Sequence, residues 1–194
     1  MKEKPNLKNI KLKEVYTLEK HQKTIKTKDF LKYIKIPQVE NYCKECDNYA
    51  VKWDCPPHKE NPLKIWLKYE NIDLYLLKLN YAPFFQKIKF TEYELRHIVK
   101  HTVYKERYKQ MDDLLKIEED KNGYLMFGGS CILCKKCTRI ENKPCRFPEK
   151  RKDSPESLGA HLINATKDIF NIELKWSKNY QIPEYITNIS LILY

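Results

Sequence analysis

The sequence predicts an α/β fold, a single metal-binding domain over residues 1–194 with a mixed sheet, flanking helices and cysteine-rich loops. Three observations lead to this prediction. Strand-like apolar runs occur at residues 73–79 and 189–194, a long segment without Gly or Pro has helical character, and the cysteines fall in polar stretches between such elements. The length of 194 residues suits one ordinary domain, and 42% hydrophobic residues suffice for a buried core.

The first elements are short. Residues 1–36 are expected to form an N-terminal extension, in which weak alternation from Val15 predicts an edge strand and Thr27 begins a short helix. The apolar run at residues 73–79 ends before Pro83, which favours a buried strand.

The clearest helix follows. Thr91 and Glu94 have the spacing of a capping box, and the segment continues without Gly or Pro to about Glu119. Asn122-Gly123 ends it, and residues 124–127 are predicted to form a strand.

The last part predicts one more helix and two closing strands. Ser154 is a suitable N-cap, and Pro155 suits the first helical position. The apolar residues after it follow at helical spacing, at Leu158, Leu162, Ala165 and Ile169. Residues 172–176 and 189–194 are expected to be strands.

The net charge of +11 is compatible with an acidic redox protein or a nucleic acid as partner. However, 32 of the 37 basic residues are lysines spread along the chain, a pattern typical of a solvated surface. The sequence has no apolar run of the length that crosses a membrane and no signal-peptide core, so we expect a cytoplasmic protein without a membrane partner. In that compartment the seven cysteines are expected to be ligands rather than disulfides.

Four cysteines lie within residues 128–148. Cys131, Cys134, Cys137 and Cys145 have the spacing C-x2-C-x2-C-x7-C. The three cysteines at intervals of three match the opening pattern of bacterial [4Fe–4S] ligation, whereas tetrahedral zinc sites usually use two separated pairs. The pattern favours a [4Fe–4S] cluster over zinc, although the seven-residue gap departs from that of a ferredoxin.

Glycine and arginine gather around the same cysteines. Gly129 would let the backbone approach the cofactor closely, and Arg146 would offset the negative charge of a thiolate-ligated cluster. Both are therefore expected to be cofactor-binding residues. A plain turn and an ordinary surface arginine are the alternative interpretations.

A second set lies within residues 43–58. Cys43, Cys46 and Cys55 supply three thiols, which leaves a metal one ligand short. The site could hold a [4Fe–4S] cluster with an open iron, or a zinc ion completed by His58. The number of clusters, one or two, depends on that choice.

The cysteine motifs together resemble those of a family of predicted metal-binding, cysteine-rich proteins that carry a domain of unknown function and are common in anaerobic bacteria and archaea. The matching segments span about residues 40–194 and are Cys43-x2-Cys46, Trp53-x-Cys55-Pro56-Pro57, Gly129-Ser130-Cys131-x2-Cys134-x2-Cys137, Pro144-Cys145-Arg146 and Arg151-x2-Ser154-x-Glu156-x2-Gly159. The resemblance implies that all seven cysteines are metal ligands and brings no reaction with it.

The leading functional hypothesis is an iron–sulfur redox protein, either an electron carrier or a small component of an oxidoreductase. One alternative is a zinc-stabilised module that binds nucleic acid or another partner. A second is a cluster enzyme that uses an open iron as a Lewis acid. The sequence does not decide whether the protein is an enzyme.

Overall fold

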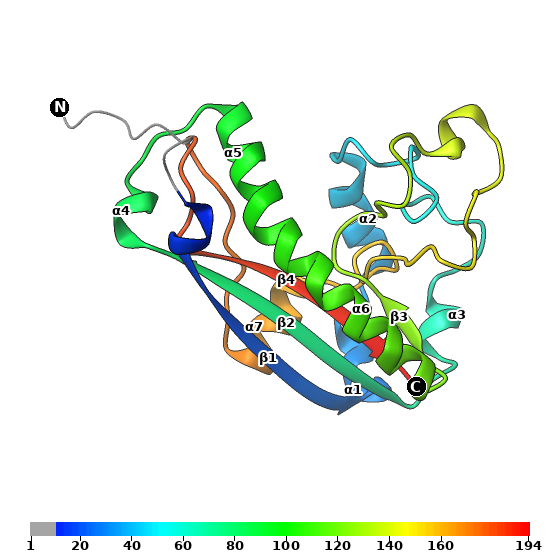
Figure 1. Cartoon of the computed structure of the whole chain (residues 1–194). Helices are drawn as coiled ribbons and strands as arrows, with labels where there is room; N and C mark the ends of the chain where they lie inside the picture. Colours follow the sequence, from blue (N-terminus) through cyan, green and yellow to red (C-terminus); the bar gives the residue numbers. More distant parts are fainter. Residues whose placement is uncertain (1–10) are drawn as a thin grey trace.

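The computed structural model describes residues 11–194, which form a four-stranded sheet with helices on both faces (Figure 1). The strand order is β1-β2-β4-β3. The strands are β1 (Tyr16–Lys26), β2 (Asn71–Tyr81), β3 (Tyr124–Met126) and β4 (Tyr185–Leu193). The predicted α/β class is confirmed.

The direction of the strands corrects the prediction of a mixed sheet, because every pair of neighbours is antiparallel. Strands β2 and β3, which the long helix connects, do run in the same direction. They are not neighbours, however, because β4 is inserted between them. Sequence patterns identify strands, but they do not say which strand lies between two others.

Strand β2 is the centre of the core, and it confirms the buried strand predicted at residues 73–79. Ile72, Leu74 and Leu76 face one hydrophobic cluster, while Leu77 and Leu79 face a second one on the opposite side of the sheet. A strand covered on both faces has an almost continuous apolar sequence, as this one does. Strand β1 lies at the edge, as expected.

The predicted long helix consists of α5 (Glu92–Val99), a π-helical turn η4 (Lys100–Tyr104) and α6 (Lys105–Asp120). Its capping box is present, because Thr91 Oγ1 accepts the Glu94 amide at 3.2 Å and Glu94 Oε2 accepts the Thr91 amide at 2.6 Å. The helix crosses one face of the sheet in Figure 1.

The opposite face is covered by shorter elements (Figure 1). These are α1 (Thr27–Phe30), η3 (Leu31–Tyr33), α3 (Leu63–Trp66) and α7 (Leu162–Phe170), while α2 (Ile36–Lys44) follows η3 in the chain. Three further short helices are η2 (Leu12–Glu14), α4 (Pro83–Gln86) and η5 (Thr138–Glu141). The short helix predicted to begin at Thr27 is confirmed, and the part of the N-terminal extension before residue 11 lies outside the described residues.

Two predictions about the last third of the chain are wrong. Helix α7 begins at Leu162 with His161 as its N-cap, because Ser154 and Ser157 close a separate turn and Gly159 then takes a φ of +88°. Residues 172–176 form no strand, although Leu174 still packs against the core. Leu158, Leu162 and Ala165 are nevertheless buried, and Ile169 is partly buried against the same core.

Across residues 11–194, no helix combines the length and apolar character that crossing a membrane requires.

Candidate metal centre

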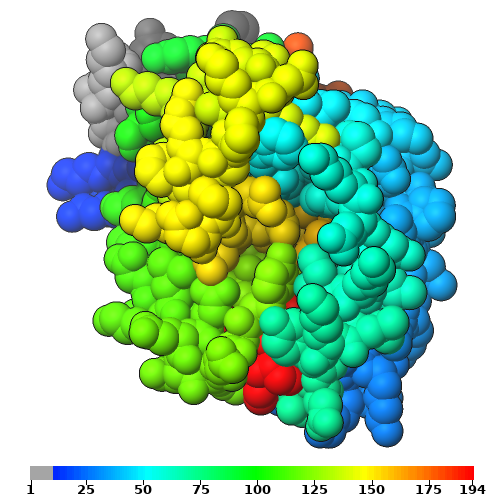
Figure 2. Space-filling view, turned by 90° about the vertical axis from the view of Figure 1, so that its right-hand side faces the viewer, coloured from blue at the N-terminus to red at the C-terminus, as the bar shows by residue number. Residues whose placement is uncertain are grey.

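Six of the seven predicted cysteines lie in two loops that pack against each other, and Cys43 lies in the last turn of α2, which leads into the first of these loops. The first loop connects α2 to α3, and the second lies between β3 and α7. They are side by side in Figure 1, and Figure 2 shows their cyan and yellow atoms next to each other on one face. The Trp53 indole of the first loop donates to the Lys143 carbonyl of the second at 3.0 Å.

Arg139 holds the two loops together. Its guanidinium donates to the carbonyls of Lys52 at 2.7 Å, Cys55 at 2.5 Å and Pro57 at 2.8 Å. It also lies over the Trp53 ring, with 5.2 Å between the guanidinium carbon and the ring centroid. The planar guanidinium presents its donors in fixed directions, whereas a lysine ammonium is a compact group that would have to approach all three carbonyls from one point.

Asp54 links the two sets directly. Its side chain is fully buried, and Oδ2 accepts the Cys131 amide at 2.7 Å while lying 3.8 Å from Cys55 Sγ. Burial raises the pKa of this carboxyl, although the Cys131 amide counteracts the rise. Lys52 reinforces the link by donating to Ser130 Oγ at 3.0 Å and to the Cys131 carbonyl at 2.9 Å.

The four cysteines of the second set surround one small cavity, of about 20 Å³. Four thiols around one void are a donor set that suits a thiolate-ligated metal centre. The void has room for a body the size of one water molecule, so a four-iron cluster requires the loop to widen. Within residues 11–194 no three metal-binding side chains are yet gathered tightly enough to hold an ion. Arg146 borders this cavity and donates to the Lys136 carbonyl at 2.9 Å.

The three cysteines of the first set line a much larger pocket, of about 440 Å³. This volume lies in the range of small-molecule sites. Burial raises the pKa of Cys43 to about 11, with a further contribution from the Glu156 carboxylate, and burial raises that of Cys55 to about 12. Both thiols are therefore protonated at neutral pH without a metal, and a bound metal must displace those protons.

His58 is not brought together with these cysteines in the pocket. Its Nε2 donates to the Ser157 carbonyl at 2.9 Å, and its side chain lines two neighbouring cavities instead. Its role as a ligand stays a prediction, and it requires the ring to leave Ser157.

Glu156 and His161 also line the pocket with the three cysteines. Glu156 Oε2 is buried without a hydrogen-bond partner among the described residues. Burial raises the pKa of this carboxyl, while the Ser154 hydroxyl and the Arg107 guanidinium act in the opposite direction. Glu156 was part of the sequence motif, but nothing in its spacing to the cysteines indicated a place beside them.

Gly129 connects the site to the long helix. It has a φ of +82°, and a Cβ there would lie 3.2 Å from Arg107 Nη1. Arg107 is buried on α6, lies over the Phe127 ring at 4.6 Å, and donates from Nη2 to the carbonyls of Gly129 at 3.2 Å and Ser130 at 2.9 Å. Burial lowers the pKa of this guanidinium. Gly129, which was predicted to bind the cofactor of the four-cysteine loop, lines the three-cysteine pocket instead, and its cofactor-binding role stays a prediction. Arg107 was missed because it is distant in sequence.

Comparison with known proteins adds one finding to this geometry. The sequence profile of the family described as "Predicted metal-binding protein (DUF2284)" matches residues 25–194, which include all seven cysteines. No curated protein and no solved structure matches the chain. The chain belongs to this family of predicted metal-binding proteins.

Proposed function

We propose that the protein is an iron–sulfur redox protein with two adjoining metal sites. The observation that carries the proposal is the pairing of the cysteine sets through Asp54, which touches Cys131 and Cys55 at once. Two metal sites joined in this way suit a protein that passes electrons from one to the other.

The two sites differ in a way that suits different tasks. Cys131, Cys134, Cys137 and Cys145 enclose a small cavity and would saturate a [4Fe–4S] cluster, which supplies one-electron chemistry. Three thiols on the open 440 Å³ pocket leave one position for an exchangeable ligand, as reactive metal sites require. The three-cysteine site would therefore hold another cluster, or a single metal ion, that contacts the substrate.

Positive charge near the four cysteines supports a cluster there. A cluster bound by four thiolates is an anion, and Lys52, Arg146 and Arg151 all line its cavity. Backbone groups held by Asp54 and Arg146 fix part of the loop around it. Charge and hydrogen bonding of this kind stabilise a reduced cluster relative to one without such neighbours.

Metal analysis of protein purified without oxygen tests the proposal. We expect iron and acid-labile sulfide in similar amounts, together with the broad visible absorption of thiolate-ligated iron. Exposure to an iron chelator under oxidising conditions should bleach this absorption. Stoichiometric zinc without iron or sulfide would contradict the proposal.

A basic groove beside Cys145 suits an acidic redox protein as the electron donor. The groove has a volume of about 790 Å³ and is lined by Lys59, Arg139 and Arg151, with Trp53 at the same surface. Complementary charge speeds association, and salt weakens it. The rate at which an acidic ferredoxin reduces the protein should fall as salt rises, while reduction by an uncharged small reductant should change little. Equal salt dependence for both reductants would rule out docking through charge.

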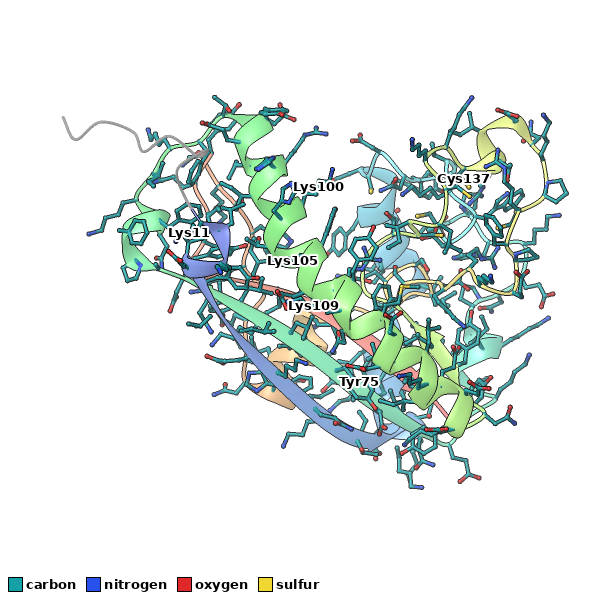
Figure 3. The ribbon with its side chains drawn as sticks, in the orientation of Figure 1. Lys11, Tyr75, Lys100, Lys105, Lys109 and Cys137 are labelled. Atoms are coloured by element: carbon teal, nitrogen blue, oxygen red, sulfur yellow. The ribbon has the colours of Figure 1, made fainter. Side chains whose placement is uncertain are left out.

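A second candidate function is a zinc-stabilised module that contacts nucleic acid. The observation that favours it is the 20 Å³ cavity, because a single ion requires less widening of the loop than a four-iron cluster. Tyr104 and Tyr108 are also exposed on the long helix, along which Figure 3 shows Lys100, Lys105 and Lys109. Lys109, however, is paired with Glu106 at 2.8 Å. The same metal analysis separates the candidates, since zinc without sulfide is the result expected for this module.

A further inference from the structure

Large apolar side chains surround the opening of the three-cysteine pocket. Tyr42, Ile163 and Trp176, which we call the rim, all line the pocket, and these residues are 52%, 42% and 57% exposed. Leaving such side chains in water costs free energy, so a group of them at one exposed place is typical of a surface that a ligand covers. The rim therefore indicates a ligand with apolar surface of its own.

The wall behind the rim is apolar as well. Val39 on α2 and Leu162 on α7 are buried, and Leu174 adds a half-buried side chain. The rings of Tyr42 and His161 are packed together with their centroids 6.1 Å apart. Aromatic and aliphatic groups gain both dispersion and hydrophobic free energy against walls of this kind. This part of the lining suits the apolar body of a small molecule.

The same pocket contains the thiols that we propose as metal ligands. Cys43, Cys46 and Cys55 all line it, and they come from the end of α2 and the loop that follows. Three thiolates leave a bound metal with one open position, which takes a head group with a free electron pair, such as an imidazole or a carboxylate. A ligand in this pocket would therefore contact the metal at one end and the apolar wall at the other.

The wall itself has no charged group that would compete with the metal for the head of the ligand. Within residues 11–194, no lysine or arginine lines the pocket. Glu156 lines it, but its Oε2 is closed to solvent, and burial raises the pKa of this carboxyl. The wall therefore selects ligands by the size and apolar surface of the body, and the metal selects the head.

We propose that the three-cysteine pocket binds a small molecule with two parts, a head group that coordinates the metal at its open position and an aromatic or aliphatic body that packs against Leu162, Leu174 and Trp176. The volume of about 440 Å³ has room for such a body beside a metal. This inference rests on the proposed function, because it requires a metal with an open position on the three thiols. It holds equally for iron and for zinc.

Three probes separate the head from the body on the metal-loaded protein. 1-Methylimidazole carries the head alone, benzyl alcohol carries the body with a hydroxyl that coordinates poorly, and 1-benzylimidazole carries both. The imidazoles are compared above their pKa, where both are neutral. We expect anaerobic isothermal titration calorimetry to show 1-benzylimidazole binding roughly tenfold or more tightly than either of the others. Equal affinities of the two imidazoles, or no binding by 1-benzylimidazole, would overturn the inference.

Variants of the rim locate the body. Trp176→Ala removes an aromatic group from the wall and should weaken 1-benzylimidazole roughly fivefold while leaving 1-methylimidazole unchanged. Tyr93→Ala is the matched control, because Tyr93 is an exposed aromatic residue on α5 outside the pocket, and it should change neither affinity. Ile163→Ala alters a second exposed position of the rim and repeats the test if the Trp176 variant does not fold. An advantage of the benzyl group that survives both rim variants would contradict the assignment.

Cys46→Ser locates the head. Cys46 is an exposed thiol of the pocket, and its loss should weaken both imidazoles while leaving benzyl alcohol unchanged. Imidazoles that bind this variant as tightly as the parent would not be coordinated at the three-cysteine site, and the inference would then be wrong.

The probe experiment and the metal analysis fail separately. Protein that holds zinc alone would end the iron–sulfur proposal while leaving the order of the three affinities as expected. Protein that holds iron and sulfide but binds the two imidazoles equally would leave the proposed function intact and refute the substrate class.

Discussion

Replacing Cys137 by serine should empty the four-cysteine site and lower the free energy of unfolding by more than about 3 kcal/mol. Residues 128–148 contain little regular structure apart from η5 (Thr138–Glu141), so we expect the loop to depend on its hydrogen bonds and on the proposed metal. The free energy of metal binding to such a loop contributes to the free energy of folding. Metal content and urea unfolding of the variant, both measured against the parent, check this expectation.

The Cys46→Ser variant is the matched control. Cys46 lies in the other loop and lines the open pocket, so its loss should affect the three-cysteine site and leave metal at the four-cysteine site. Cys134→Ser should behave like Cys137→Ser, because both thiols border the same small cavity. If Cys137→Ser keeps its full metal content and unfolds like the parent, the four-cysteine site is wrongly assigned.

The second large effect is expected on replacing Arg107 by alanine. The substitution removes a buried cation and leaves the Gly129 and Ser130 carbonyls without their donor. It also removes the contact with the Phe127 ring. Losing a buried, charge-assisted pair of hydrogen bonds costs about 3 kcal/mol of unfolding free energy. Urea unfolding monitored by circular dichroism measures the loss.

Arg96→Ala supplies the comparison on the same long helix. Arg96 bonds Glu92 one turn away at the exposed surface, so its removal should leave the unfolding free energy almost unchanged. Arg107→Ala should also lower the affinity for metal, because the displaced carbonyls adjoin Cys131. Equal stability of the Arg96 and Arg107 variants would show that the buried guanidinium does not support the site.

Several elements were predictable because their signals are local. The capping box at Thr91 fixes where α5 starts, and the apolar run in β2 reflects burial on both faces. The spacing of the cysteines separated them into two sets, and each set borders its own cavity. In all three cases the relevant residues lie within a few positions of one another.

What the sequence did not predict depends on contacts between distant segments. Asp54 meets Cys131 across 77 residues, and Arg107 meets Ser130 from a different element. Glu156 lines the three-cysteine pocket from the turn that Ser154 and Ser157 close, and the same turn made the predicted start of α7 wrong. The sequence pattern of one segment does not indicate which side chains of a distant segment will contact it.

The π-helical turn at Lys100–Tyr104 acts as a phase shift within the long helix. Such a turn adds one residue, so α6 is rotated by about 100° relative to a continuous α-helix that keeps the phase of α5. In α5 the phase places Ile98 against the sheet, and in α6 it places Leu114 in the core and Arg107 at the Gly129 carbonyl. A continuous α-helix without the extra residue could not place both Ile98 against the sheet and Arg107 at the Gly129 carbonyl. The inserted residue therefore allows one long helix both to pack against the sheet and to orient the backbone beside the candidate metal centre.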